Sequence, residues 1–174
     1  MGGVCILLFG FIAASGIRML IEKKVNYTKS RNLILTAVTM ISGLSGATIV
    51  LGPVQLKDGD SDYVIREIRR MKELVGDKIL KVIVETCYLT EEEKIEACRC
   101  VTRGGADYIK TSTGFGTGGA TLDDVALFKK YIGPAVKIKA SGRIHTKEEM
   151  EAYLALGVDR IGASGAVSVL ADKK

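Results

Sequence analysis

Apolar residues in the second half of the chain repeat first with the period of a helix and then with that of a strand. In YVIREIRRMKELVG, residues 63–76, apolar side chains recur at helical spacing before a final glycine. The next run, KILKVIVET at 78–86, is rich in β-branched residues and predicts a strand. A second helix is predicted where Thr90, as N-cap, is followed by Glu93 and later by Gly104 as a stop.

The same alternation continues through residue 164. It predicts further strands at residues 106–112, 135–141 and 159–164, and helices at 121–133 and 146–157. Both of these helices open with a threonine that is suited to be the N-cap. Strands separated by single helices form parallel β/α units, which build either a doubly wound sheet or a (β/α)8 barrel.

Charge within one predicted strand separates these two folds. In AVKIKAS, residues 135–141, Val136 and Ile138 alternate with Lys137 and Lys139, so one face is apolar and the other carries amines. A doubly wound sheet has helices on both faces and favours continuous apolar strands, whereas the inner face of a barrel accepts polar groups near its mouth. We therefore predict an α/β fold of the (β/α)8 TIM barrel class.

The first 55 residues do not follow this pattern. Residues 4–17 and 32–56 are two runs without charge, joined by a basic connector. By length alone the second run is able to span a bilayer, but it holds many Ser, Thr and Gly residues. No positively charged segment precedes the first run, which argues against a secretory signal. We expect residues 1–55 to be buried barrel elements or an aberrant hydrophobic segment, with membrane spans as the alternative, and residues 56–174 to form half a barrel.

Two lysines are placed where a barrel enzyme carries its reacting groups. Lys110 and Lys139 lie at the carboxyl ends of successive predicted strands. Adjacent strands lie about 4.8 Å apart, so two inward amines at one depth are near neighbours. Each positive charge disfavours protonation of the other, and burial acts in the same direction. One amine then becomes a nucleophile near neutral pH, as Schiff-base chemistry requires, whereas a pair of solvated strand-end lysines is the plainer interpretation.

The glycine-rich run after Lys110 has two interpretations. Gly114, Gly116 and Gly119 match the G-x-G-x-x-G dinucleotide fingerprint, but the acidic residue expected at the end of the next strand is missing. We therefore do not expect NAD. The second interpretation is that bare backbone amides approach a phosphate, as barrel loops often do. Residues predicted to surround one anion come from three loops: Gly114, Gly142, Gly162 and Ser164. A phosphorylated carbonyl compound is the indicated substrate class.

Composition fits a single domain that binds a small anion. The chain has 174 residues and is 47% hydrophobic, and its 25 Lys and Arg against 20 Asp and Glu give a net charge of +5. This charge is too small to argue for nucleic acid, and aromatic residues are few. Cys5, Cys87, Cys98 and Cys100 lack C-x-x-C spacing and His145 is the single histidine, so we expect reduced thiols, a surface histidine and no metal site.

Four segments, in order and with the expected spacing, resemble the second half of a deoxyribose-phosphate aldolase. They are KVIVETCYLTEEEK, GADYIKTSTGFGTGGAT, VKIKASGRI and RIGAS. The resemblance runs from about Leu56 to Ser164 and is most specific around Lys110. It implies a cytoplasmic class I aldolase that cleaves 2-deoxy-D-ribose 5-phosphate reversibly to acetaldehyde and glyceraldehyde 3-phosphate, without metal or organic cofactor, and that forms a homo-oligomer.

The resemblance also implies roles for particular residues. Lys110 matches the lysine that forms the Schiff base, and Lys139 matches the second lysine that perturbs it. The phosphate contacts of the family fall on residues of three loops: Gly114, Phe115, Gly142, Arg143, Ile144, Gly162 and Ser164.

The sequence departs from the family at three places. Arg143 stands where the family usually has a second glycine. The strand-four aspartate that takes part in proton transfer is missing from GATIVLGPVQLKDGD, and Asp58, Asp60 and Asp62 follow too late to replace it. Strands one to three are not recognisable before Gly46. Three hypotheses therefore stand: an aldolase, a catalytically impaired half-barrel that persists as an oligomer, and a membrane-associated protein with an aldolase-like domain.

Overall fold

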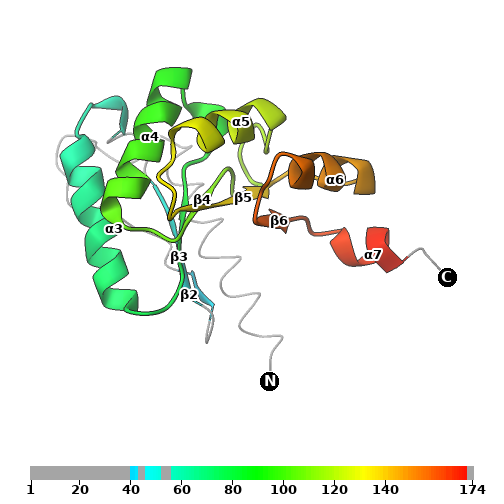
Figure 1. The fold of residues 1–174 in the computed structure, drawn as a ribbon, viewed down its shortest axis with the longest axis horizontal. Coiled ribbons are helices and arrows are strands. Elements are labelled where there is room, and N and C mark those ends of the chain that lie inside the picture. The colour runs from blue at the N-terminus through cyan, green and yellow to red at the C-terminus, as the bar shows by residue number, and fades with distance from the viewer. Residues whose placement is uncertain (1–39, 43–45, 52–55, 172–174) are drawn as a thin grey trace, which may run out of the picture.

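The computed structural model describes residues 40–42, 46–51 and 56–171, and its centre is a six-stranded sheet (Figure 1). The strands follow one another in sequence order, with β1 antiparallel to β2 and all later neighbours parallel. The strands are β1 (Met40–Ser42), β2 (Gly46–Val50), β3 (Leu80–Ile83), β4 (Tyr108–Lys110), β5 (Lys137–Ser141) and β6 (Arg160–Gly162).

A helix follows each strand from β2 onwards. The helices are α3 (Ser61–Val75), α4 (Glu91–Gly104), α5 (Leu122–Tyr131), α6 (Lys147–Ala155) and α7 (Ala166–Ala171), with a short 3-10 helix, η1 (Thr86–Tyr88), after β3. The strands and helices predicted between residues 63 and 164 are all confirmed, with boundaries that differ by a few residues. Gly46–Val50 also joins the sheet, so the sheet begins before residue 56.

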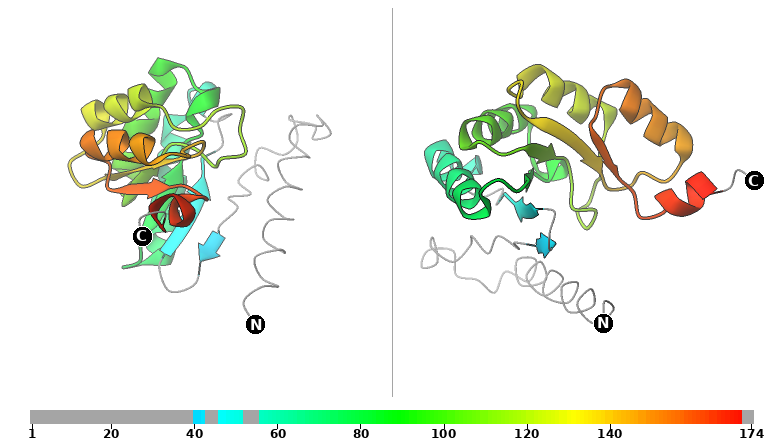
Figure 2. Two further views of the ribbon diagram at one scale, coloured as in Figure 1. Left: turned by 90° about the vertical axis from the view of Figure 1, so that its right-hand side faces the viewer. Right: turned by 60° about the horizontal axis from the view of Figure 1, so that its bottom comes forward.

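The layering is that of a barrel wall and not of a doubly wound sheet. Helices α3, α4, α5 and α6 line up along one side of the sheet, as the right-hand view of Figure 2 shows. A doubly wound sheet would distribute its helices over both faces. The predicted barrel class is therefore confirmed, while the described strands form an open, incomplete barrel in which β1 and β6 are the two ends of the strand order.

Strand side chains alternate between the two faces of the sheet. The residues that face the helices are apolar and almost fully buried, and include Ala47, Ile49, Leu80, Val82, Ile109 and Ile138. Because the side-chain period in a strand is two, the positions between them point to the inner face. The helix side thus forms the core, whereas the inner face combines lysines with the side chains of Ile83 and Tyr108.

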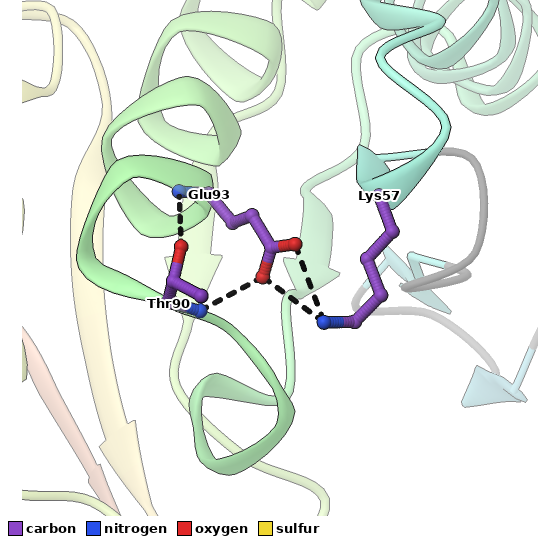
Figure 3. Close-up of polar contacts among 3 residues, drawn as sticks. All are labelled: Lys57, Thr90 and Glu93. Carbon is purple, nitrogen blue, oxygen red and sulfur yellow. Dashed lines mark hydrogen bonds and ion pairs between the residues drawn. The ribbon is translucent and has the colours of Figure 1, made fainter.

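Capping boxes fix where two of the helices, α4 and α6, begin. Thr90 accepts a hydrogen bond from the Glu93 N–H at 3.3 Å, and the Glu93 carboxylate accepts one from the Thr90 N–H at 2.8 Å. Lys57 donates to both oxygens of the same carboxylate (Figure 3). Thr146 and Glu149 form an equivalent capping box at α6. The caps predicted at Thr90 and Thr146 are confirmed.

Similar tripeptides, Gly-Ala-Asp at 105–107 and Gly-Val-Asp at 157–159, precede β4 and β6 and have the same structural role. The Asp107 carboxylate accepts the Leu80 N–H at 2.7 Å, and the Asp159 carboxylate accepts the Ile138 N–H at 2.9 Å. Each aspartate therefore joins the start of its own strand to the start of the preceding one. This repeated bond stabilises the end of the sheet opposite the predicted site.

The three aspartates after β2 do not lie at the sheet face. The Asp60 side chain caps α3 by accepting the Tyr63 N–H at 3.1 Å, and Asp62 lies 4.0 Å from Arg103 at the surface. Asp58 is exposed. Within the described ranges, no helix is both long and apolar enough to cross a membrane. The interpretations offered for residues 1–39 lie outside the described residues.

Close packing of α3 on α4 predicts a large cost for shortening Ile68. Its side chain is fully buried, and a Cβ added at Gly104 of α4 would lie only 2.6 Å from the Ile68 Cβ. We expect Ile68→Ala to lower the free energy of unfolding by about 2–5 kcal/mol, measured by urea denaturation. Leu74→Ala on the same helix is the control, since Leu74 is 72% exposed and should change stability by no more than about 0.5 kcal/mol. Equal effects of the two variants would contradict this packing.

Candidate active site

The register of the sheet places Lys110 directly opposite Lys139. Both residues lie on neighbouring parallel strands, β4 and β5, as Cα partners. Both point to the inner face, since Ile109 and Ile138 on the same strands are buried towards the helices. Both side chains are half-buried. The two amines therefore share one side of the sheet at one depth.

This placement changes the acid–base chemistry of Lys110. Its pKa is lowered to about 8, first by burial and then by the positive charge of Lys139. The charge of Glu85 opposes this shift, and that of Lys81 adds to it. Burial and the nearby Arg160 also lower the pKa of Lys139. A substantial fraction of Lys110 is therefore an uncharged nucleophile slightly above neutral pH.

A third lysine, Lys81, belongs to the same face and was not predicted from the sequence. It lies on β3 opposite Tyr108 and is only 8% exposed. Burial lowers its pKa, and the charges of Arg160 and Lys139 lower it further. The available signal was one lysine inside the otherwise apolar run ILKVIV, residues 79–84.

The inner face is therefore strongly basic. Strands β2 to β6 contain no aspartate or glutamate, whereas five of their inner-face positions are cationic. These residues are Lys81, Lys110, Lys137, Lys139 and Arg160. The Arg160 guanidinium also lies over the Tyr108 ring, 4.9 Å from its centroid. Strands β2 to β6 therefore supply no replacement for the strand-four aspartate of the family.

Two of the predicted anion-binding glycines, Gly114 and Gly142, lie together at the carboxyl ends of β4 and β5, with Gly119 beside them. Gly114 and Gly142 have positive φ angles of 97° and 89°, which favour glycine. A Cβ on Gly142 would lie 3.4 Å from the Gly114 Cα and 3.3 Å from the Gly119 Cα. The Ala120 N–H donates to the Gly142 carbonyl at 3.1 Å, which joins the two loops.

The other glycines of the run serve packing. A Cβ added at Gly116 would lie 2.9 Å from the Cys87 Sγ, and one at Gly118 would lie 2.8 Å from the Cys87 Cβ. These two positions are therefore glycine because the loop passes close to Cys87. Gly162, on β6, leaves room for Lys139, whose Cε would be 3.0 Å from an added Cβ.

The other residues predicted to contact the phosphate differ in their exposure and backbone conformation. The Phe115 side chain is 76% exposed, and its N–H already donates to the Thr113 hydroxyl at 3.1 Å. Ile144 is buried in the core, and Ser164 is exposed in the loop after β6. Arg143 is exposed and has a φ of 56°, a left-handed conformation that is unusual for a residue other than glycine.

Buried hydroxyl groups fix the ends of β4 and β5 relative to each other. The Thr111 hydroxyl donates to the Ser141 carbonyl at 3.0 Å and accepts from the Ser141 N–H at 3.1 Å. The Ser141 hydroxyl donates to the Ser112 carbonyl at 2.6 Å. Because these groups are buried, the bonds hold the backbone directly after Lys110 against the end of β5.

Other predicted features lie away from this edge. Burial raises the pKa of the Cys98 thiol to about 12 and that of Cys100 to about 11, so these thiols are protonated and unreactive. His145 is exposed, as predicted, and its backbone N–H donates to the Glu149 carboxylate. In the part of the chain that the structure describes, no three His, Cys, Asp or Glu side chains gather as a metal site.

An open parallel β/α sheet with helices along one side defines an α/β protein of the (β/α)-barrel class. Comparison with known proteins agrees. Deoxyribose-phosphate aldolase of Clostridium botulinum (strain Eklund 17B) is 56% identical over 135 residues, which is 78% of this chain and 61% of the relative. The aligned part of the chain belongs to the deoxyribose-phosphate aldolase family.

Solved structures give the same assignment. An aldolase designated QR15 superposes with a TM-score of 0.68 at 38% identity, over 72% of this chain and 57% of that one. A tetrameric deoxyribose phosphate aldolase from Aeropyrum pernix has a TM-score of 0.60 at 27% identity, over 71% and 53%. The chain thus spans about three-fifths of the curated relatives it matches. Residues 1–52 match a different model, that of a permease family.

Removing the charge at position 139 should raise the pKa of Lys110. Lys139→Met keeps the length of the side chain, and we expect the Lys110 pKa to rise from about 8 by on the order of one unit. The measurement is the pH dependence of Lys110 acetylation, followed by mass mapping. Lys130→Met, an exposed change on α5, is the control. A Lys110 midpoint that is the same in all three proteins would show that the two amines do not interact.

Replacing Arg143 by glycine should not destabilise the protein. The left-handed conformation costs an L-residue roughly 1–2 kcal/mol, part of which glycine loses again through the entropy of its unfolded chain. We expect Arg143→Gly to leave the free energy of unfolding unchanged or to raise it by up to about 1 kcal/mol. Lys130→Gly, within α5, should instead lower it by about 1 kcal/mol. Equal losses in urea denaturation would mean that the Arg143 side chain stabilises its loop.

Proposed function

We propose that this chain carries the Schiff-base chemistry of a class I aldolase, with 2-deoxy-D-ribose 5-phosphate as substrate and acetaldehyde and D-glyceraldehyde 3-phosphate as products. The observation that supports it most directly is the half-buried Lys110 amine opposite Lys139, with a pKa lowered to about 8. Identity to deoxyribose-phosphate aldolases over 135 residues supplies the particular sugar.

The proposed reaction uses Lys110 as an electron sink. Its uncharged amine adds to the carbonyl carbon of the sugar, and loss of water gives a protonated imine. The bond between the second and third carbons of the sugar, one bond beyond the imine carbon, then breaks. Its electron pair becomes the double bond of an enamine as the iminium electrons move to nitrogen, and the hydroxyl on the third carbon loses a proton as that carbon leaves as the second aldehyde. Protonation of the enamine and addition of water release acetaldehyde and return the free amine.

Lys139 is proposed to keep Lys110 uncharged through like-charge repulsion. The phosphate is proposed to bind where the loops after β4 and β5 meet, at Gly114 and Gly142, with Arg143 adding a positive charge. Gly162, Ile144 and Ser164 complete the proposed set. The N–H of Phe115 would have to exchange its present partner, Thr113, for a phosphate oxygen.

A second candidate rests on what the described sheet does not contain. Strands β2 to β6 hold no carboxylate for the proton-transfer steps, and β6 is the last strand of an open sheet. An impaired half-barrel would then form the imine and fail in cleavage.

An open strand edge also favours association with another copy, so we propose a homo-oligomer. A phosphate ester is a metabolite of the cell interior, and we therefore place the activity in the cytoplasm.

The division of the chain is likewise a proposal. We propose that residues 56–174 are the barrel half and that residues 1–55 are a segment of different origin, apart from β1 and β2, which extend the sheet. The match of residues 1–52 to a permease family supports a separate origin for this segment.

The test of the function is to trap the imine. Incubation with acetaldehyde and borohydride should leave an ethyl group on Lys110, located by mass mapping, because its amine is uncharged near neutral pH. Lys110→Arg keeps a charge at this position and should show no preferred site of modification. A well-folded protein that is modified evenly over its surface lysines would refute the enzymatic proposal. A Lys110 adduct without cleavage of deoxyribose 5-phosphate would favour the impaired half-barrel.

A further inference from the structure

Glu85 is held in a strained conformation directly after β3. Its φ and ψ are 53° and 67°, in the left-handed region, and the residue is only 6% exposed. Such a conformation costs a residue other than glycine of order 1–3 kcal/mol and persists only where the surroundings impose it. Glycine or asparagine would suit this backbone better. The side chain of Glu85 therefore has a role that the backbone alone does not explain.

The carboxylate of Glu85 reaches the glycine-rich loop after Lys110. Its Oε2 accepts the N–H of Thr113 at 3.0 Å, and its Oε1 would lie 3.1 Å from a Cβ on Gly116. The Cys87 Sγ lies 4.0 Å from Oε1. Glu85 thus joins the end of β3 to the first turn of this loop, three residues after Lys110. Backbone bonds from Val84 to Lys110 and from Thr86 to Thr111 hold the same two segments together.

Glu85 is also the negative group among the charges that act on Lys110 within the described residues. Lys139 on β5 and Lys81 on β3 both oppose protonation of Lys110, and Glu85 favours it. Arg160 on β6 acts on Lys81 and Lys139. Asp107, at the other end of β4, acts on Lys81. The carboxylate therefore limits how far the surrounding cations suppress the charge of Lys110.

We propose that Glu85 is a positioning residue for Lys110: its carboxylate holds the glycine-rich loop against the end of β3 and supplies the negative charge that the inner face of the sheet lacks. A side-chain amide would hold the loop equally well. The carboxylate is required for the second role, which sets the pH range in which Lys110 is a free amine. This inference rests on the proposed function, in which Lys110 forms the imine.

Two variants separate the hydrogen bond from the charge. Glu85→Gln keeps an acceptor for the Thr113 N–H and removes the charge, so the pH midpoint of Lys110 acetylation should fall by roughly half a unit or more. Amide hydrogen exchange at Thr113 should stay as in the unchanged protein. Glu85→Ala removes both roles, and exchange at Thr113 should become at least about tenfold faster. Glu73→Gln, an exposed carboxylate on α3, is the control and should change neither measurement.

Each result decides the inference. An unchanged Lys110 midpoint in Glu85→Gln, or unchanged Thr113 exchange in Glu85→Ala, overturns it. Should Glu85→Ala fail to fold, the Glu85→Gln midpoint alone remains decisive. Acetylation and hydrogen exchange need no aldehyde, so the absence of an imine with acetaldehyde would refute the proposed function and leave these two measurements interpretable.

Discussion

The structure depends on the register between β4 and β5, which pairs Lys110 with Lys139 on the inner face of the sheet. Because side chains alternate along a strand, Ile109 and Ile138 are buried on the helix side of the sheet, and the two amines therefore point to the inner face. A shift of one residue would exchange the faces, burying amines among the helices, and would therefore be strongly disfavoured. The apolar core on one side of the sheet thus enforces the chemistry on the other.

The same register also brings several positive charges close together on one face of the sheet. Cations on β3, β4, β5 and β6 repel one another, and strands β2 to β6 carry no acid to offset them. The contacts that stabilise the site lie at the carboxyl ends of the strands. They are the hydroxyl bonds of Thr111 with Ser141, the glycine contacts between two loops, and the strained Glu85 beside Lys110. Order at this edge comes from side-chain-to-backbone bonds together with backbone bonds between neighbouring segments. Arg143 adds a further positive charge at the same edge, in a conformation better suited to glycine.

Local sequence was enough to predict the repeating elements, since helix caps such as Thr90 with Glu93 and Thr146 with Glu149 act over three residues. The alternation in AVKIKAS was enough to choose a barrel over a doubly wound sheet. Long-range features were missed. The burial of Lys81 depends on neighbours that are distant in the sequence, which a local pattern does not identify. The contact of Glu85 with Thr113 likewise spans 28 positions in the sequence. Gly116 looked like part of a dinucleotide-binding fingerprint and instead accommodates Cys87, since sequence cannot show which neighbour approaches a bare backbone.

The central claim is that one lysine of this chain is uncharged near neutral pH because of burial and a neighbouring amine. NMR titration of protein labelled with 13C at the lysine Cε tests this claim most directly, since each amine reports its own protonation. The account predicts one resonance, absent from Lys110→Arg, that titrates near pH 8. If the resonance assigned to Lys110 titrates with an ordinary lysine pKa of about 10.4, the amine is solvated and the proposed nucleophile does not exist.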